Sequence, residues 1–273
     1  MSNLAKRVII AGAAGPLILW VSYVGGVPLL VFLILLLGLG LAEFLNMPKP
    51  RMPILNQAVF MVLGLLVFLF EAVDVLPFSD YMPFFLFGGF SLIAIIEVIR
   101  EDVTCSARHT AWGVLGVFYV VFLGLHLYKL RLAIGEKAET PIWIISLFLM
   151  VWLNDISAYF AGKYFGKKKV RIHISPNKTF LGCYAGLAGS ILIAFIFWLN
   201  LPGGFSLFRF LALGLLIGVI SQVGDFWESL VKRMVSVKDS SAIIPGHGGI
   251  LDRFDGVLFA APALYYFLLF WGN

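Results

Sequence analysis

Long apolar segments recur along the whole chain, and they limit its possible folds more than any other feature. Each is long enough to cross the hydrocarbon core of a bilayer, and Gly, Pro or a cluster of charges separates it from the next. Because 61% of the 273 residues are hydrophobic and 13% are charged, the chain cannot cover itself with a water-soluble surface. A segment in lipid must satisfy its own backbone hydrogen bonds, and runs rich in Leu, Ile and Phe favour helices over barrel strands.

We therefore expect an all-α, polytopic integral membrane protein with about nine transmembrane helices. The expected segments are residues 8–24, 26–46, 54–72, 76–98, 109–128, 141–165, 181–200, 206–230 and 255–271.

The basic residues are distributed unevenly between the two sides that alternating spans define. Of the 20 lysines and arginines, 16 fall on one side. The four on the other side are Lys129, Arg131, Lys137 and Arg209. By the positive-inside rule the richer side is cytoplasmic. We therefore expect a protein of the cytoplasmic (inner) membrane, with its N-terminus inside and the polar segments 163–179 and 231–254 facing the cytoplasm.

The two halves of the chain differ in their charged residues. Residues 1–130 are typical of plain membrane helices joined by short loops, and we expect their few acids to be peripheral. The density of charge rises after residue 150. We therefore divide the chain into N-terminal membrane helices, 1–130, suited to packing and dimer contacts, and C-terminal membrane helices, 131–273, that carry a cytoplasm-facing catalytic site.

Two polar residues, Asn154 and Asp155, lie inside the apolar segment 141–165. An ionisable group at that depth costs roughly 2.5 to 3.5 kcal/mol on insertion scales, so it usually faces a polar cavity. A buried polar pair that joins neighbouring helices is the alternative interpretation. The pair is therefore a candidate substrate-binding element.

The motif "SPNKT" precedes the next span. Ser175, Asn177, Lys178 and Thr179 bring hydroxyl, amide and ammonium donors to a helix start, where free backbone N–H groups also attract anions. A phosphate group would fit there. An ordinary helix-start signal explains the same residues equally well.

A further group of charges lies near the cytoplasmic end of the segment 206–230. Asp225, Glu228 and Lys232 are three and four positions apart, so they share one helical stripe. The stripe offers oxygen and ammonium groups to a ligand, and salt bridges among its members are the alternative.

Two aspartates, Asp252 and Asp255, stand three positions apart at the first turn of the last helix, so their carboxylates point the same way. Carboxylate oxygens that remain partly open to water suit Mg²⁺ bridging substrate phosphates, and Asp225 offers a third oxygen. Acids in a first turn also complement the helix dipole, by about 0.3 to 1 kcal/mol, but that explains only one aspartate.

The sequence just before these aspartates combines glycines with cations. Gly246, Gly248 and Gly249 surround His247 and let the backbone approach a ligand closely. Fixed positive charge comes from Lys232, Arg233, Lys238 and Arg253. The combination is typical of a site for phosphates.

The segment "SLVKRMVSVKDSSAIIPGHGGILDRFD", residues 229–255, resembles the C-terminal motif of the phosphatidate cytidylyltransferases, or CDP-diacylglycerol synthases. Every fixed position of that motif is filled. Asn154 and Asp155, here called the "ND" pair, and the "SPNKT" motif resemble a second region of the family. One position departs from the pattern, because Leu181 stands between Phe180 and Gly182 where the family usually has Glu.

The resemblance implies a membrane-embedded homodimer that converts CTP and phosphatidic acid into CDP-diacylglycerol and pyrophosphate. It implies Mg²⁺ and allows a second cation. Membrane lipids are expected partners and nucleic acid is not. On this basis the expected catalytic residues are Asp225, Lys238, Asp252, Arg253 and Asp255. The expected metal ligands are Asp225, Asp252 and Asp255. The expected substrate-binding residues are Asn154, Asp155, Ser175, Asn177, Lys178, Thr179, Lys232, Arg233, His247, Gly248 and Gly249.

Three other functions share some of these features. An ion-coupled transporter also contains acids inside its spans, but it predicts acids at the bilayer midplane and repeat symmetry, which this sequence lacks. Another Mg²⁺-dependent membrane transferase, acting on polyprenyl phosphate, would share the metal ion, the aspartates and the topology. Only the spacing of the His-Gly-Gly and Asp-Arg-x-Asp elements argues against it. A structural scaffold that binds anionic lipid leaves residues 245–255 unexplained.

Overall fold

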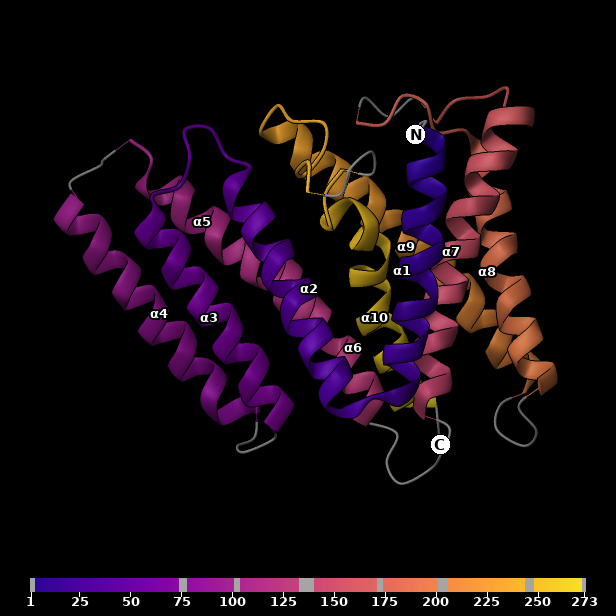
Figure 1. The fold of residues 1–273 in the computed structure, drawn as a ribbon, viewed down its shortest axis with the longest axis horizontal. Coiled ribbons are helices and arrows are strands. Elements are labelled where there is room, and N and C mark those ends of the chain that lie inside the picture. Colours follow the sequence, from indigo (N-terminus) through magenta and orange to yellow (C-terminus); the bar gives the residue numbers. More distant parts are fainter. Residues whose placement is uncertain are drawn as a thin grey trace.

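The computed structural model is a bundle of helices, and the part of the chain that it describes contains no strand (Figure 1). That part comprises residues 3–73, 78–100, 104–132, 140–170, 174–200, 206–243 and 248–271, without the side chains of 3–11, 73, 78–83, 85–86 and 140. The helices are α1 (Asn3–Val24), α2 (Gly26–Asn46), α3 (Ile54–Val73), α4 (Phe78–Arg100), α5 (Ser106–Gly116), η1 (Val117–Phe122), α6 (Leu123–Leu132), α7 (Thr140–Phe165), α8 (Phe180–Asn200), α9 (Leu207–Met234) and α10 (Leu251–Trp271).

The prediction of an all-α polytopic membrane protein is confirmed, but the count of about nine spans is not. Among the described residues, seven helices are long and apolar enough to cross a membrane, and α1 adds a shorter apolar stretch, Gly12–Val24. The two expected spans outside those seven, 8–24 and 76–98, correspond to α1 and α4. Both of these helices begin with residues whose side chains lie outside the described part.

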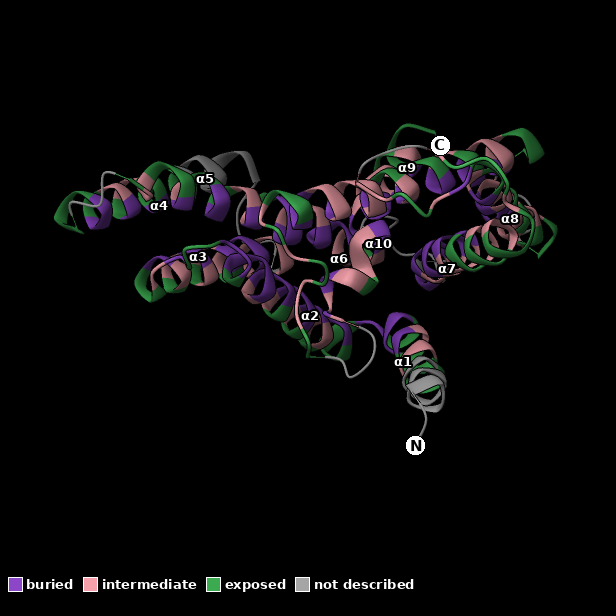
Figure 2. Ribbon diagram, turned by 90° about the horizontal axis from the view of Figure 1, so that it is seen from above, coloured by how far each residue is buried: buried purple, intermediate pink, exposed green. Residues whose placement is uncertain are grey.

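The helices are arranged side by side in an elongated molecule (Figures 1 and 2). At one end α7, α8, α9 and α10 pack consecutively, with α7 against α8 as the most extensive contact. At the other end lie α3 and α4. Helix α6 packs on α10 and thereby joins the two halves. The segments between α7 and α8 and between α9 and α10 emerge at the same end of the bundle as the start of α1, and α10 ends at the opposite end (Figure 1).

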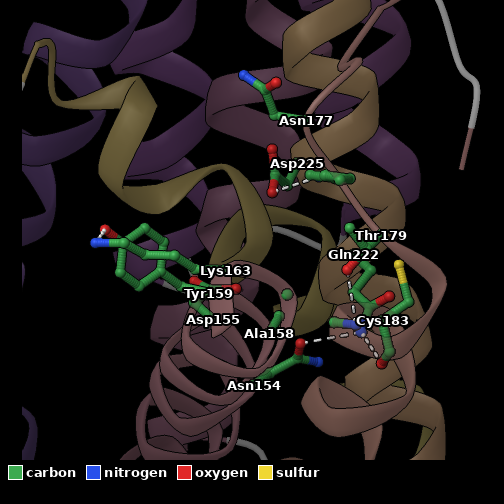
Figure 3. A pocket seen from close by; sticks show the side chains of 13 residues that line it. Asn154, Asp155, Ala158, Tyr159, Lys163, Asn177, Thr179, Cys183, Gln222 and Asp225 are labelled. Atoms are coloured by element: carbon green, nitrogen blue, oxygen red, sulfur yellow. Dashed lines mark hydrogen bonds and ion pairs between the residues drawn. The ribbon is translucent and has the colours of Figure 1, made fainter. Parts of the chain in front are cut away.

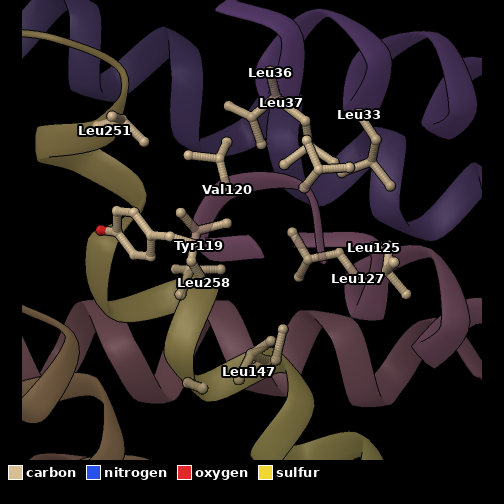
Figure 4. Close-up of a cluster of buried hydrophobic side chains, with 14 of the residues drawn as sticks. Leu33, Leu36, Leu37, Tyr119, Val120, Leu125, Leu127, Leu147, Leu251 and Leu258 are labelled. Carbon is tan, nitrogen blue, oxygen red and sulfur yellow. The ribbon is translucent and has the colours of Figure 1, made fainter. Parts of the chain in front are cut away.

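The core lies where the two halves meet. Leu37 of α2, Val120 of η1 and Leu258 of α10 are all buried in one cluster (Figure 4). Helices α5, η1 and α6 run on as one rod, and its central turn is a π-helix, Val117–Phe122. Such turns shift the register of side chains within a helix. The side chain of Tyr119 on this turn is almost fully buried between the two halves.

Small residues let the helices of the N-terminal half approach closely, which is how membrane helices commonly pack. Gly113 on α5 faces the buried ring of Phe60 on α3. A Cβ at position 113 would lie 1.9 Å from the Cε2 atom of Phe60. The contact therefore tolerates no side chain unless the ring moves.

We expect Gly113→Ala to lower the midpoint of thermal unfolding in detergent, because overpacking of a core costs about 1 to 3 kcal/mol. Gly38→Ala is the matched control, since nothing lies within 4 Å of a Cβ at that position of α2. The control should be unchanged or slightly more stable, because Ala in a helix is favoured over Gly by about 0.5 to 1 kcal/mol. Equal midpoints for the two variants would contradict the packing described for α3 and α5.

Candidate active site

A cavity of about 440 Å³ opens between α7, α8 and α9, near the end of the bundle from which the polar segments emerge (Figures 1 and 3). Helix α7 lines it with Asn154 and Asp155, and α9 lines it with Gln222 and Asp225. The remaining wall is the first turn of α8, with Gly182 and Cys183, and the segment that leads into it. That segment contributes Asn177, Lys178 and Thr179. The structure thus brings together the "ND" pair, most of the "SPNKT" motif and Asp225.

The inner end of the cavity is held by a network of amide side chains. Asn154 is fully buried, and its Nδ2 donates to the carbonyl of Gly218 at 2.9 Å and to Oγ of Ser221 at 3.1 Å. Its Oδ1 accepts a hydrogen bond from Nε2 of Gln222 at 3.1 Å. Nε2 of Gln222 also donates to the carbonyl of Cys183 at 2.9 Å. Asn154 and Gln222 therefore join α7, α8 and α9, so Asn154 has the helix-joining role that was its alternative interpretation.

The "SPNKT" motif combines its two expected roles. Oγ1 of Thr179 accepts a hydrogen bond from the backbone N–H of Gly182 at 3.1 Å and thereby caps α8. Lys178 instead points across the cavity, where its Nζ lies 2.6 Å from Oδ2 of Asp225 and 3.8 Å from the ring centre of Phe226. Thr179 is therefore mainly a capping residue, whereas Lys178 offers a positive charge to the cavity.

Three acids from different helices influence one another electrostatically, and two of them, Asp155 and Asp225, line the cavity. Asp155 lies within electrostatic range of Asp225, and both lie within range of Asp255 on α10. Lys178 and Arg253 are positively charged and also act electrostatically on Asp155. Like charges held together in a low-dielectric setting repel strongly, so this cluster favours a cation or a basic ligand group nearby.

Asp252 has a different environment from Asp255. Its Oδ1 lies 2.5 Å from Nζ of Lys232, and its Oδ2 accepts from the backbone N–H of Gly249 at 2.7 Å. Oδ2 also accepts from both the backbone N–H and the hydroxyl of Ser240, each at 3.0 Å. Lys232 also pairs with Glu228 one turn earlier on α9. Asp252 is therefore already saturated with donors inside the protein.

The glycines of this segment surround a carboxylate. Gly248 has φ +81°, and a Cβ there would lie 2.5 Å from Oδ2 of Asp252. A side chain at position 248 is therefore excluded both by the backbone conformation and by the carboxylate. The turn that was expected to approach a phosphate encloses Asp252 in this structure.

The other predicted residues lie around these two groups. Arg233, Lys238 and Arg253 are exposed, and Arg233 donates from Nη1 to the carbonyl of Val237 at 3.1 Å. Ser175 is half-buried and is not part of the cavity wall. His247 lies outside the described residues.

Sequence reasoning missed two residues that the structure places in or beside the candidate site. Gln222 carried a usable signal, since it is a polar residue three positions before Asp225 in the same span. Glu43 is the second, and the expectation that acids of the N-terminal half are peripheral is wrong for it. The side chain lies at the interface with the 240–251 segment, and the residue is only 3% exposed. A single acid within the apolar segment 26–46 was its only signal.

Comparison with known proteins finds sequence similarity over nearly the whole chain. The sequence profile of the cytidylyltransferase family matches residues 5–271. The chain belongs to this family. A protein from Brucella abortus named phosphatidate cytidylyltransferase is 36% identical over 98% of this chain and 94% of its own length. Proteins of the same name from Staphylococcus saprophyticus and Synechocystis are 31% and 32% identical, over 90% and 86% of this chain and 91% and 86% of their own lengths.

The position at which this member departs from the pattern of the family lies away from the cavity. Leu181 is exposed on α8 and does not contribute to the cavity wall, whereas its neighbour Gly182 does. Gly182 also packs tightly, because a Cβ there would lie 2.8 Å from the carbonyl oxygen of Ala158. The substitution of an apolar residue at 181 therefore leaves the cavity lining unchanged.

We expect Asn154→Ala to destabilise the protein by about 2 kcal/mol or more, because it leaves buried partners on α9 unsatisfied. Thermal unfolding in detergent measures the effect. Asn200→Ala is the matched control, since Asn200 is exposed and bonds only within its own helix, to the carbonyl of Ile196. The control should stay within about 0.5 kcal/mol of the unchanged protein. A similar loss in both variants would mean that the network does not hold α7 to α9.

Proposed function

We propose that the protein transfers the cytidylyl group of CTP to phosphatidic acid and releases CDP-diacylglycerol and pyrophosphate. The observation that carries the proposal is the coincidence of two findings. The similarity to proteins named phosphatidate cytidylyltransferase extends over 98% of the chain. Asn154, Asp155, most of the "SPNKT" motif and Asp225 line one cavity near the polar end of the bundle. A water-soluble nucleotide can reach such a site while a lipid stays in the bilayer.

The reaction needs little acid–base chemistry from the protein. The second pKa of a phosphate monoester is about 6, so the lipid phosphate is mostly a dianion at neutral pH. One of its oxygens attacks the α-phosphorus of CTP, the new P–O bond forms, and the bond to the β-phosphate breaks with the electron pair leaving on pyrophosphate. Two polyanions must approach each other, so the site has to supply positive charge and precise placement.

The cations around the cavity suit that requirement. Lys178 is held at the cavity by Asp225 and by the ring of Phe226, and a phosphate group can take over its charge. Arg253 is exposed in the first turn of α10 and acts electrostatically on Asp155. We assign both to phosphate oxygens, and Lys238 and Arg233 to the approach of the triphosphate.

Mg²⁺ fits the open acids of the cavity. It is usually held by one or two carboxylates together with substrate phosphates and water, rather than by a full cage of side chains. Among the described residues no group of three or more His, Cys, Asp or Glu side chains is placed to hold a metal alone, which is compatible with a site that the substrate completes. Asp225 and Asp255 would hold the ion, and Asp155 leaves room for a second cation. The ion supplies positive charge to the triphosphate oxygens.

Asp252 suits the metal less well than the other two aspartates. Four donor contacts, from Lys232, Ser240 and Gly249, already occupy its oxygens. We therefore assign Asp252 to the organisation of the 240–251 segment and of Lys232. In this role it still affects catalysis, because Arg253 and Asp255 follow it in the same helix.

The membrane supplies the lipid from the side. Ile156 and Phe160 on α7 and Phe180 on α8 are exposed apolar residues close in sequence to residues of the cavity wall. Acyl chains can lie against them while the headgroup reaches Lys178. By the positive-inside argument we place the cavity at the cytoplasmic face of the inner membrane, with the N-terminus on that face. We also propose a homodimer, on the basis of the family resemblance.

We expect purified protein in detergent micelles to release pyrophosphate from CTP when phosphatidic acid and Mg²⁺ are present. ATP, GTP and UTP should give little or no release under the same conditions. Loss of signal after removal of either the lipid or the metal ion is part of the prediction. Release without lipid would indicate simple nucleotide hydrolysis. Release that requires polyprenyl phosphate in place of phosphatidic acid would replace the proposed acceptor.

Asp255→Asn should lower turnover about a hundredfold or more, because it removes a carboxylate that would hold the Mg²⁺ needed to offset the charge of the reacting phosphates. Glu71→Gln is the matched control, since it also removes an acid that is paired with a lysine, Lys129, at the other end of the bundle. The control should keep turnover close to that of the unchanged protein. Near-normal turnover in Asp255→Asn would remove Asp255 from the metal and phosphate assignment.

A further inference from the structure

Glu43 on α2 holds the beginning of α10. Its Oε1 accepts hydrogen bonds from Oγ of Ser241 at 2.6 Å and from the backbone N–H of Ile250 at 2.9 Å. Its Oε2 accepts from Oγ of Ser240 and from the backbone N–H of Leu251, each at 3.0 Å. Both carboxylate oxygens are thus engaged by groups of the segment that resembles the family's C-terminal motif. The single hydroxyl proton of Ser240 bonds either Glu43 or Asp252 at any one time.

Two of these donors are backbone N–H groups at the N-terminus of α10. Helix α10 begins at Leu251, so the N–H groups of Ile250 and Leu251 have no acceptor within the helix. A carboxylate at this point satisfies them and also complements the positive end of the helix dipole. In most helices a residue next to the helix provides this cap. Here it comes from α2, 207 positions before Ile250 in the sequence.

The contact between Glu43 and the segment is closely packed. A Cβ at Gly249 would lie 2.5 Å from Oε2 of Glu43 and 1.9 Å from Oγ of Ser240. Just beyond the carboxylate, Leu251 is buried, and its side chain lies 3.3 Å from where a Cβ of Gly40 would be. The first residues of α10 are therefore seated on α2 by a polar contact and an adjoining apolar one.

Ser240 connects Glu43 to the cavity side of the segment. Its hydroxyl oxygen lies 3.0 Å from Oε2 of Glu43 and 3.0 Å from Oδ2 of Asp252. Asp252 in turn lies 2.5 Å from Nζ of Lys232 on α9. Glu43 is thus the N-terminal member of a continuous series of contacts from α2 through the segment to α10 and α9.

We propose that Glu43 is a positioning residue for the transfer reaction. By fixing where α10 starts, it fixes the height and rotation of the first turns, and hence where Arg253 and Asp255 face Asp155. The inference rests on the proposed cytidylyltransferase function of the same site. It gives the N-terminal half a direct part in the site, since the contact comes from a helix that carries none of the motif residues.

The test compares Glu43→Gln and Glu43→Asp with Glu71→Gln. The Gln side chain keeps the size of Glu but loses the charge and turns an N–H₂ group toward N–H donors, so the cap fails. The Asp side chain keeps the charge but is one methylene shorter, so it restores part of the cap. Glu71→Gln removes an acid that pairs with Lys129 on α6 and does not contact the segment.

Two readouts separate positioning from general stability. The first is hydrogen–deuterium exchange of the peptides that contain Ile250 and Leu251, measured without substrate. We expect at least tenfold faster exchange there in Glu43→Gln, with unchanged protection in α8. The second is steady-state kinetics, where we expect at least a tenfold loss of kcat/KM and a higher CTP concentration for half-maximal rate. Partial unfolding alone would lower the maximal rate and leave that concentration unchanged.

Glu43→Asp should recover part of both losses, and Glu71→Gln should show neither. Unchanged exchange at Ile250 and Leu251 in Glu43→Gln would overturn the inference, as would kinetics within twofold of the unchanged protein. A loss of rate that matches Glu71→Gln, with the CTP dependence unaltered, would also overturn it. Failure of the proposed function is a separate result. In that case the unchanged protein would show no lipid-dependent transfer, and the exchange data for Glu43→Gln would not affect that conclusion.

Discussion

The start of α10 depends on two carboxylates that come from different parts of the chain. Asp252 accepts from Gly249 and Ser240, and Glu43 accepts from Ile250 and Leu251. The first N–H groups of a helix have no acceptor within the helix, and each one that is buried without a partner costs about 1 to 3 kcal/mol. The two acids remove that cost and place the first turn of α10 beside α9.

This arrangement explains why the two halves of the molecule form one unit. Helix α6 packs along α10 within the core, and Glu43 of α2 holds the end of α10 that faces the cavity. The N-terminal helices therefore do more than fill space in the membrane. They form the surface on which the motif-bearing helix is seated, so a change in α2 can reach the cavity without touching a substrate.

The sequence predicts the fold class well and indicates part of the cavity wall, because both depend on local patterns. Apolar length predicts helices in lipid, and the "ND" and "SPNKT" motifs carry polar groups that have few other uses inside a membrane protein. It predicts the partners of those groups poorly. Nothing local indicates that Asn154 meets Gln222 or that Glu43 meets Ile250, since tertiary packing alone brings such distant residues together. Spacing likewise groups Asp252 with Asp255, whereas their surroundings differ.

Acids in this part of the fold therefore have different surroundings. Glu43 and Asp252 are surrounded by N–H and O–H donors, so their charge is balanced within the protein and a cation would gain little there. Asp225 and Asp255 face each other and Asp155, with Lys178 and Arg253 as partial compensation. A cation or a positive group of a ligand would reduce the repulsion among them. We therefore expect the reaction near Asp225 and Asp255, whose charge is incompletely balanced. Glu43 and Asp252, whose charge is balanced, hold the start of α10 in place.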